Sequence, residues 1–228
     1  MPAKKTISAR SEPEHPQLVI QAPNIQSSTF ELVGTAPLVQ CAFGEKQRNS
    51  MRDAQAVGSQ QRKKEKGKKA PKDFRECYME AMHVSTEGWY GHPASAFRQA
   101  MVSACRTGGM AMTLAKLAIV IKADGIDRAS GMPLVRINGE PEYFESAVRL
   151  KKASVFDIRA RPMFREWSCN LTVLFDADVF TVDDIANLIL RAGLQVGIGE
   201  GRNDSKDSCG VGWGSFEFKQ EAKAQKTA

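Results

Sequence analysis

The segment that most constrains the fold is the glycine-rich stretch "GLQVGIGEGRNDSKDSCGVGWGSFEF", which spans residues 193–218 and holds seven of the chain's 18 glycines. An apolar, helix-like run precedes it, and an alternating, strand-like run closes it. Glycine allows a positive φ angle and the close approach of another backbone. The stretch is therefore either a set of tight turns or a backbone surface along which a polymer lies. The sequence leaves both interpretations open.

Two nucleotide-binding motifs are excluded here. In a dinucleotide-binding fingerprint the glycines lie between a strand and the following helix, whereas these follow a helix-like run and precede a strand. No GxxxxGK[ST] sequence occurs in the chain, so a Walker loop is absent. We expect no cofactor. Gly199, Arg202 and Lys206 are candidate phosphate contacts, because exposed N–H groups in glycine turns bind anions as basic side chains do.

Residues 45–72 concentrate the positive charge of the chain. Between Lys46 and Lys72 there are ten Lys and Arg against two acids, a local charge of +8, whereas the whole chain carries +6 and has a pI of about 9.1. Large apolar residues are almost absent from the segment, so we expect a mobile loop. It is either a solvated charge run or an electrostatic arm for a nucleic-acid backbone. Its candidate contacts are Arg48, Arg52, Arg62, Lys63 and Lys64.

Two helical patterns follow the basic segment. "PKDFRECYMEAMHV" places its apolar residues on one helical face, and "PASAFRQAMVSACR" does the same after Pro93, which suits a first helical turn. Trp89, Tyr90 and His92 immediately precede this second helix. A helix start favours anions and aromatic rings stack on bases, so these three residues are candidate nucleic-acid contacts. Alternatively, they anchor the turn.

Residues 110–180 read mostly as strands. The candidates are "LAIVIKAD", "MPLVRING", "SAVRLKKASVFDIRARPMF" and "EWSCNLTVLFD", with Asn138-Gly139 as a hairpin signal and "GMAMTLAK" as a strand or a short helix. Alternation places Arg159 and Arg161 on one strand face, opposite Phe156 and Ile158. That arrangement is expected of a sheet that binds single-stranded nucleic acid. It is also expected of any half-exposed β-strand.

The end of the chain is a β-α-β unit. The strand "CNLTVLF" leads to the helix "TVDDIANLILRA", which Thr181 caps and Gly193 stops, and the glycine stretch then leads to a strand at 213–218. Two β segments with a kink between them occupy residues 28–44. We predict an α+β fold with a ferredoxin-like or RRM-like core and inserted loops. An extended arm at 1–27 precedes the single domain at 28–219, and a polar tail at 220–228 follows it.

Other functional classes find little support. The five cysteines are scattered without a CxxC pair and only three histidines occur, which argues against a disulfide framework and a structural zinc site. Glu200, Asp204 and Asp207 would be the metal ligands of a nuclease, although their spacing is not that of a calcium loop. No signal peptide or apolar run of membrane-spanning length is present, so we expect a cytoplasmic protein with no membrane partner.

Three stretches resemble a known family in their order along the chain: "FELVGTAPLVQCAFGE", "WYGHPASAFRQAMVSACR" and "RAGLQVGIGEGRNDSKDSCGVGWGSFEF". Together they resemble the RAMP superfamily, and within it the backbone subunit of CRISPR effector complexes, as well as stand-alone bacteriophage proteins. The resemblance implies an RRM-like core, a thumb-like insertion, a filament of subunits and backbone contacts to single-stranded RNA. Pro93, Ser95 and Arg98 match the helix-start motif of the family. No family catalytic aspartate can be placed, so the resemblance implies no cleavage.

These observations predict a non-enzymatic protein that binds single-stranded nucleic acid, RNA favoured, by phosphate-backbone contacts largely without sequence specificity. Self-association or other complex subunits are the expected protein partners. Two alternatives remain. One is a structural or interaction protein of a phage or of a CRISPR-associated antiviral assembly. The other is a metal-dependent nuclease.

Overall fold

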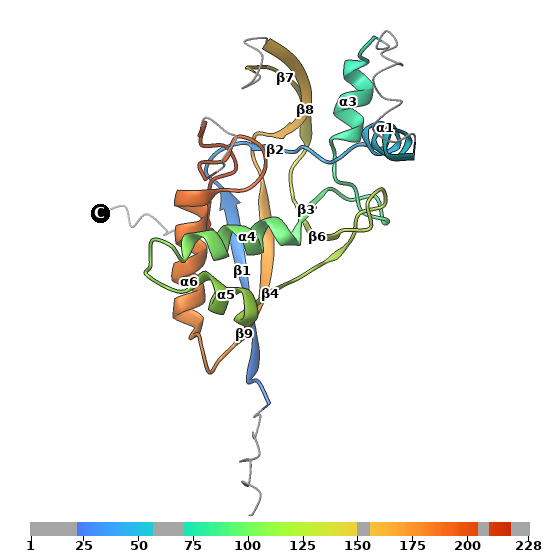
Figure 1. Ribbon diagram of the computed structural model, residues 1–228. Helices are drawn as coiled ribbons and strands as arrows, with labels where there is room; N and C mark the ends of the chain where they lie inside the picture. Colours follow the sequence, from blue (N-terminus) through green and yellow to red (C-terminus); the bar gives the residue numbers. More distant parts are fainter. Residues whose placement is uncertain (1–21, 57–70, 150–155, 205–209, 220–228) are drawn as a thin grey trace, which may run out of the picture.

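The computed structural model describes residues 22–56, 71–149, 156–204 and 210–219. Two long strands, β1 (Ile25–Gly34) and β9 (Ser168–Asp176), pair antiparallel at the centre of the main sheet. β4 (Ile119–Lys122) pairs with the other edge of β9, and β10 (Phe216–Phe218) pairs with the end of β1. The strand order is therefore β10-β1-β9-β4, with every neighbour antiparallel (Figure 1).

Helices cover one face of this sheet (Figure 1). α4 (Ala94–Ala104) and α6 (Val182–Arg191) lie against it, and α5 (Met112–Ala118) leads directly into β4. The chain order β1-α4-β4-β9-α6-β10, combined with the strand order, is that of a ferredoxin-like core. The predicted α+β class with a ferredoxin-like core is confirmed. Of the two predictions for "GMAMTLAK", the helix is correct.

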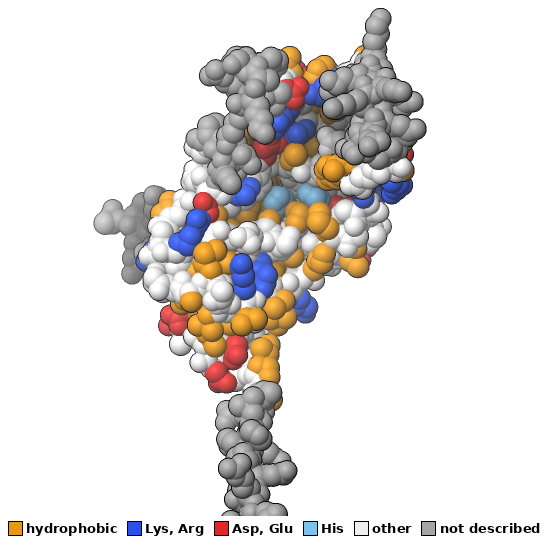
Figure 2. Space-filling model, viewed as in Figure 1, with side chains coloured by type: hydrophobic (Ala, Val, Ile, Leu, Met, Phe, Trp, Pro, Cys, Tyr) orange, Lys and Arg blue, Asp and Glu red, His pale blue; other side chains and the backbone are white. Residues whose placement is uncertain are grey.

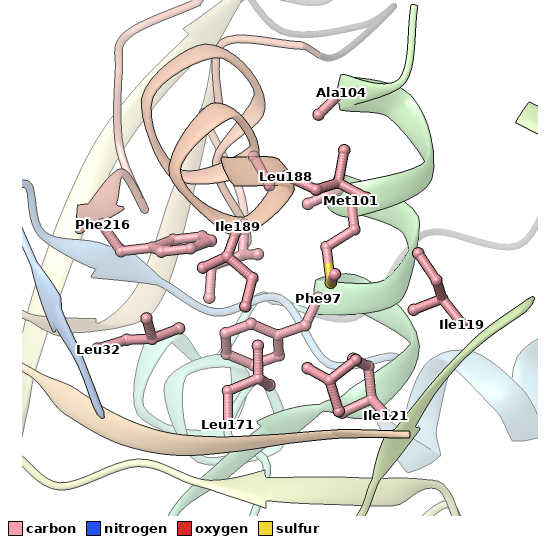
Figure 3. Packing of buried hydrophobic residues seen from close by; sticks show 14 of the residues in the cluster. Leu32, Phe97, Met101, Ala104, Ile119, Ile121, Leu171, Leu188, Ile189 and Phe216 are labelled. Atoms are coloured by element: carbon pink, nitrogen blue, oxygen red, sulfur yellow. The ribbon is translucent and has the colours of Figure 1, made fainter. Parts of the chain in front are cut away.

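The hydrophobic core lies between the helices and the sheet. Phe97 of α4 is 1% exposed, and its ring centroid lies 6.1 Å from that of Phe216 in β10. Figure 3 shows Phe97 and Met101 pointing toward Ile189 of α6 and Leu171 of β9. The whole apolar stripe predicted for this helix is buried. Burial of one such ring stabilises the fold by about 3 kcal/mol, so α4 is firmly fixed relative to the sheet.

The opposite face of the main sheet carries polar side chains together with the exposed apolar residues Ile25 and Val120. The cross-strand partners Thr29 and Thr172 form a hydrogen bond between their hydroxyl groups on this face, at 2.9 Å. The exposed Asn170 lies on the same face. Strand alternation places no aromatic side chain on this face within the described part of the chain. Bases therefore have no ring to stack on, in contrast to the sheet of an RRM.

A second sheet stands at the end of the molecule away from the start of β1 (Figure 1). It contains β2 (Leu38–Val39), β8 (Phe156–Phe164) and β7 (Pro141–Arg149), in the order β2-β8-β7. The kinked pair predicted for residues 28–44 is β1 and β2. The single long strand predicted around residues 146–164 is wrong, because β7 and β8 are two antiparallel strands with residues 150–155 outside the described chain.

A third, small sheet has the order β3-β6-β5, from β3 (Gly91–Pro93), β5 (Gly125–Ile126) and β6 (Pro133–Arg136). The hairpin predicted at Asn138-Gly139 is wrong, because β6 pairs with β3 and β5 and not with β7. Asn138 instead exchanges two backbone hydrogen bonds with Ser168, at 2.8 and 3.0 Å. The turn thus guides the chain from one sheet to the next.

The loop predicted at 45–72 begins as a helix, α1 (Glu45–Ala56), which buries none of its residues. Its Glu, Lys, Gln, Arg and Ala residues favour a helix without tertiary burial. An ion pair of 2.6 Å between Lys46 and Glu76 links it to α3 (Phe74–Glu80), the first of the two predicted helices. Residues 57–70 of the predicted loop lie outside the described residues.

Two predicted boundaries also change. β1 begins at Ile25, inside the arm predicted at 1–27. Residues 1–21 of that arm and the predicted tail at 220–228 lie outside the described residues. Gly193 does not stop the last helix. After α6 the chain continues as a π-helical turn, η1 (Ala192–Val196), and Gly197 ends it with a φ of 72°.

Among the residues that the structure describes, none of the helices has the length and apolar content needed to cross a membrane.

Candidate nucleic-acid interface

The described parts of the glycine loop, which we define as residues 197–204 and 210–214, fold back against the chain itself. A β-carbon added to Gly199 would lie 2.5 Å from the carbonyl oxygen of Val39 in β2, and one added to Gly214 would lie 1.8 Å from that of Ile198. The Ile198 N–H also donates to the Gly214 carbonyl at 3.0 Å. The close neighbour that these two glycines accommodate is the protein's own backbone. At these positions the tight-turn interpretation is therefore correct.

The glycine loop places one carboxylate between two arginines of β8. Glu200 Oε1 accepts from Arg159 Nη1 at 3.0 Å, and Oε2 accepts from Arg161 Nε at 2.8 Å. Burial acts to raise the pKa of Glu200, but the hydrogen bonds and charges of Arg161 and Arg159 outweigh it and hold the pKa below its usual value. The two arginines share a strand face, as alternation predicted.

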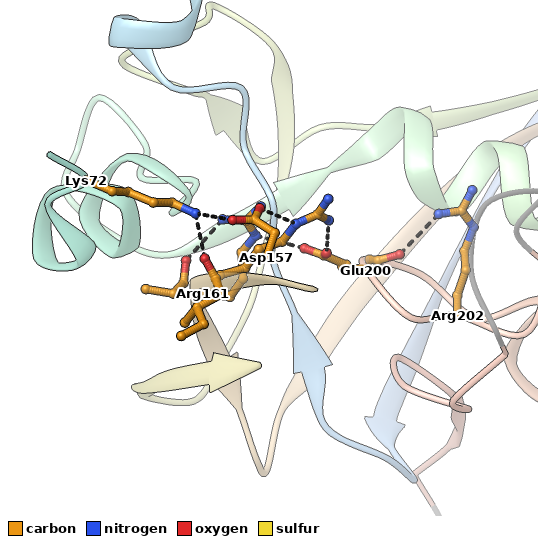
Figure 4. A network of polar contacts seen from close by, with 9 residues as sticks. Lys72, Asp157, Arg161, Glu200 and Arg202 are labelled. Carbon is orange, nitrogen blue, oxygen red and sulfur yellow. Dashed lines mark hydrogen bonds and ion pairs between the residues drawn. The ribbon is translucent and has the colours of Figure 1, made fainter. Parts of the chain in front are cut away.

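Two further cations extend this arrangement. Lys72 Nζ lies 3.0 Å from Asp157 Oδ1, and the other carboxylate oxygen of Asp157 lies 3.6 Å from Arg159 Nε. On the far side of Glu200, Arg202 Nη1 donates to the Gly199 carbonyl at 3.1 Å. Figure 4 shows the resulting line of polar contacts running from Lys72 to Arg202.

We call this set the basic row, which consists of Lys72, Arg159, Arg161, Arg202, Asp157 and Glu200. Four cations and two carboxylates leave it with a net charge of +2. Each guanidinium carries five N–H donors, and Glu200 accepts from one nitrogen of each of its two arginines. The side chain of Arg159 is 29% exposed, so donors remain within reach of a ligand. The row can therefore bind an anion that competes with Glu200.

The two aromatics before α4 pack into the protein. Trp89 is half-buried against the small sheet, where its ring occupies the space beside Gly125 and Arg136 lies 5.9 Å from its centroid. Tyr90 meets Phe164 of β8 edge to face, with centroids 5.9 Å apart. These contacts match the turn-anchor interpretation of both residues.

The start of α4 combines a buried imidazole with an exposed hydroxyl. His92 is 4% exposed, and its Nδ1 is buried with no hydrogen-bond partner. Burial, followed by the nearby charges of His83 and Arg202, lowers the pKa of His92 to about 3, so the ring is neutral. Pro93 is the N-cap and contributes no side-chain hydrogen bond, and Ser95 is exposed in the first turn. This helix start lies close enough to the basic row for the Arg202 charge to act on it.

Arg98, a predicted nucleic-acid contact, makes hydrogen bonds within the protein. Its Nε donates to the Ile119 carbonyl at 2.8 Å, and its Nη2 donates to the Lys116 carbonyl. Both acceptors lie where α5 meets β4. Arg98 therefore ties α4 to the end of α5, where carbonyl groups lack helical partners, and it is separate from the basic row.

The α1 arginines are also apart from the row. Arg48 donates to the Ala129 carbonyl at 2.8 Å, and Arg52 donates to Asn49 within the same helix. Arg62, Lys63, Lys64 and Lys206 lie outside the described residues. Of the predicted contacts, the structure brings together Arg159, Arg161, Gly199 and Arg202, with His92 beside them.

Two of the three carboxylates considered as nuclease ligands have arginine partners. Glu200 holds Arg159 and Arg161, and Asp204 accepts from Arg106. Asp207 lies outside the described residues. Within the described parts of the chain no three His, Cys, Asp or Glu side chains gather as a metal site would require.

A second polar feature escaped the sequence analysis. His83 and Asp127 form a buried pair, with Nδ1 and Oδ2 2.9 Å apart and exposures of 5% and 3%. The ring of His92 meets that of His83 edge to face at 6.0 Å. In Figure 2 histidine appears only as small pale-blue areas, in keeping with the low exposure of both rings. The sequence carries no signal for this pair, because the two residues are far apart in the chain and belong to no motif.

Comparison with known proteins identifies no family for this chain. No protein-family model and no curated protein matches the chain. One solved chain similar to it, in the cryo-EM structure of the Type III-B Cmr-beta bound to cognate target RNA, superposes with a TM-score of 0.44 and 10% identity. The match covers 86% of this chain but only 60% of that one. At this distance no residue takes a role from that structure.

Proposed function

We propose that this protein binds single-stranded nucleic acid, with RNA favoured, by contacts to the phosphate backbone that are largely independent of base sequence. The observation that carries the proposal is the basic row. Its arginines come from β8 and the glycine loop, and they retain donors that a phosphate can use. The charge of one of them, Arg202, acts on His92 at the start of α4. Phosphate groups bind such guanidinium clusters by charge-assisted hydrogen bonds.

Glu200 has a specific part in this proposal. A carboxylate held by two arginines occupies the place that a phosphate oxygen would take. Binding therefore exchanges one anion for another, which avoids leaving the arginines unpaired in the free protein. The proposal includes no catalysis, because Glu200 and Asp204, two of the three carboxylates considered for metal binding, are engaged with arginines.

Two finer statements belong to the same proposal. The chain is a member of the RAMP superfamily with a CRISPR-associated or phage role, which the order of its three motifs along a ferredoxin-like core supports. Copies of the protein assemble along the bound strand. β4 and β10 are the edge strands of the main sheet, and an edge strand offers backbone groups to a neighbour.

The experiment compares variants with opposite expected effects, using fluorescence anisotropy with labelled oligo-uridine. Arg159→Gln removes an accessible cation and should weaken binding about tenfold. Glu200→Gln removes the competing carboxylate and should tighten binding by a similar factor. Arg165→Gln is the control, because Arg165 pairs with the exposed Glu142 outside the row, and it should change affinity little.

Loss of fold cannot mimic this result, since a misfolded Glu200→Gln variant would not bind more tightly. If the wild-type protein does not bind the oligonucleotide at low salt, or if both row variants bind like the control, the proposal is wrong. Electrophoresis of the recovered oligonucleotide tests the non-enzymatic part, for which intact RNA is expected. Light scattering of complexes with increasing strand length tests assembly.

A further inference from the structure

Two half-buried aromatic rings lie beside the basic row and take no part in the proposed phosphate contacts. Phe144 belongs to β7 and Trp213 to the glycine loop. Their ring centroids are 5.5 Å apart and the ring planes meet at 87°, so the two rings form an edge-to-face pair. No pattern in the sequence joins these residues, because they lie far apart in the chain.

Each ring is next to a member of the basic row. Phe144 is the cross-strand partner of Arg161, and directly opposed residues project from the same face of a sheet. Trp213 packs over Gly201, the residue before Arg202. A β-carbon added to Gly201 would lie 2.5 Å from Cε3 of the indole ring. The aromatic pair therefore stands beside the guanidinium groups of the row.

The pair keeps aromatic surface that its own contacts do not cover. In an edge-to-face pair one ring offers its edge and the other receives it on a face. The backbone at Gly201 covers part of one face of the indole. If Phe144 offers the edge, both faces of its ring are free of the indole, and if Trp213 offers it, the indole face away from Gly201 is free of Phe144. Both residues are partly exposed, so a planar group can contact the pair.

A nucleobase is the planar group that a strand on the basic row brings to this position. Base and phosphate belong to the same nucleotide, and the rings adjoin Arg161 and Arg202, which would hold the phosphate. Aromatic side chains stack on every base, because each base has a π-face. The described strands of the main sheet offer no aromatic side chain on the face that the helices leave uncovered. The second sheet and the glycine loop supply the stacking surface instead.

We infer that Phe144 and Trp213 form a stacking site for an unpaired base of the strand whose phosphates lie on the basic row. The inference rests on the proposed function and adds a contact to the base that the arginines do not supply. Stacking does not read the edges of a base, so it is compatible with binding that is largely independent of sequence. It does need an unpaired base that can leave its neighbours, and it therefore favours single strands over duplexes.

The test compares the affinity of the full chain for two single strands with the same number of phosphates: oligo-uridine and a strand of abasic ribose units. The wild-type protein should bind oligo-uridine about tenfold more tightly, because only this strand has bases to stack. Trp213→Leu and Phe144→Leu should each reduce the preference to about twofold. Their affinity for the abasic strand and its dependence on salt should stay nearly the same, since no phosphate contact is lost.

Trp89→Leu is the matched control, because Trp89 is also a half-buried tryptophan but packs beside Gly125 in the small sheet. This variant should keep the preference for oligo-uridine. Trp213→Phe retains an aromatic ring and should keep most of the preference. A variant that merely distorts the glycine loop would weaken the binding of both strands alike, so the ratio of the two affinities separates stacking from structural damage.

Equal affinity of the wild-type protein for the two strands overturns the inference and leaves the proposed function intact. A preference that survives in the folded leucine variants of Phe144 and Trp213 also overturns it, as does an equal loss in Trp89→Leu. If Trp213→Leu does not fold, Phe144→Leu alone decides. If neither strand binds at low salt, the proposed function fails together with the inference.

Discussion

His92 shows how burial sets the protonation of a single residue in this protein. The ring is 4% exposed, lies edge to face against Phe97 with centroids 6.1 Å apart, and is close to the charges of His83 and Arg202. Burial and these charges oppose protonation and lower its pKa to about 3. In the unfolded chain the same group returns to an ordinary value of about 6.5. Folding is therefore coupled to pH through this residue.

We expect His92 to destabilise the folded state increasingly as the pH falls. Below about pH 6.5, His92 is protonated in the unfolded chain but stays neutral in the folded protein. The free energy of unfolding therefore falls as the pH decreases from about 6.5 to the folded-state pKa of about 3. At about pH 5 the loss should be about 2 kcal/mol relative to neutral pH. Urea denaturation at several pH values measures it.

His92→Phe is the comparison for this prediction, because it keeps an aromatic ring but cannot be protonated. The difference in unfolding free energy between neutral pH and about pH 5 should be about 2 kcal/mol smaller in the variant. An identical pH dependence in both proteins would show that His92 takes up its proton in the folded state.

At the scale of elements, the glycine loop follows from constraints on its own backbone. Gly214 has a φ of 69°, and an added β-carbon would overlap the Ile198 carbonyl. The sequence predicted a loop between the last helix and the last strand, and it also placed the Thr181 cap, where the structure has a complete capping box. It did not predict which segment the glycines face. For Gly199 that segment is β2, which lies far away in the sequence.

Gly214→Ala should lower the free energy of unfolding by more than a comparable glycine substitution elsewhere. Gly131 is the matched control, since its φ of 72° is similar but no atom lies within 4 Å of an added β-carbon. Both variants incur about 1 kcal/mol of backbone strain, and Gly214→Ala adds about 2 kcal/mol or more from the clash. Chemical denaturation of the two variants gives the difference directly. Equal losses would mean that the loop has room to adjust.

At the scale of the whole molecule, the charge is unevenly distributed along the chain. The whole chain has a net charge of +6, and the segment from Lys46 to Lys72 alone carries +8, so the rest of the chain carries −2. A chain charged in this way should attract a polyanion mainly through that segment. Binding would then weaken steeply with salt, because each neutralised phosphate releases counterions.

Replacing the six basic residues from Arg62 to Lys69 with serine should reduce both the affinity and its dependence on salt. The slope of log affinity against log salt should fall by about 0.7 for each phosphate that the variant no longer neutralises. The control replaces six other basic residues with serine: Lys4, Lys5, Arg10, Lys219, Lys223 and Lys226. Both changes bring the net charge from +6 to zero. If the two variants bind alike, total charge controls binding and the segment has no special role.

The sequence by itself determined the α+β class, the ferredoxin-like order of elements, the buried stripe of α4 and the cap of α6. These features follow from local periodicity and capping, which neighbouring residues express. Only the tertiary structure determined which ionisable side chains form pairs. The partners Arg161 and Glu200, and likewise His83 and Asp127, are about 40 residues apart in the chain. The packing of the glycine loop against β2 and β8 brings the first pair together, and backbone hydrogen bonds between residues 84–86 and 126–128 bring the second pair together. No local pattern encodes a contact of that kind, because its free energy comes from packing and desolvation between distant segments.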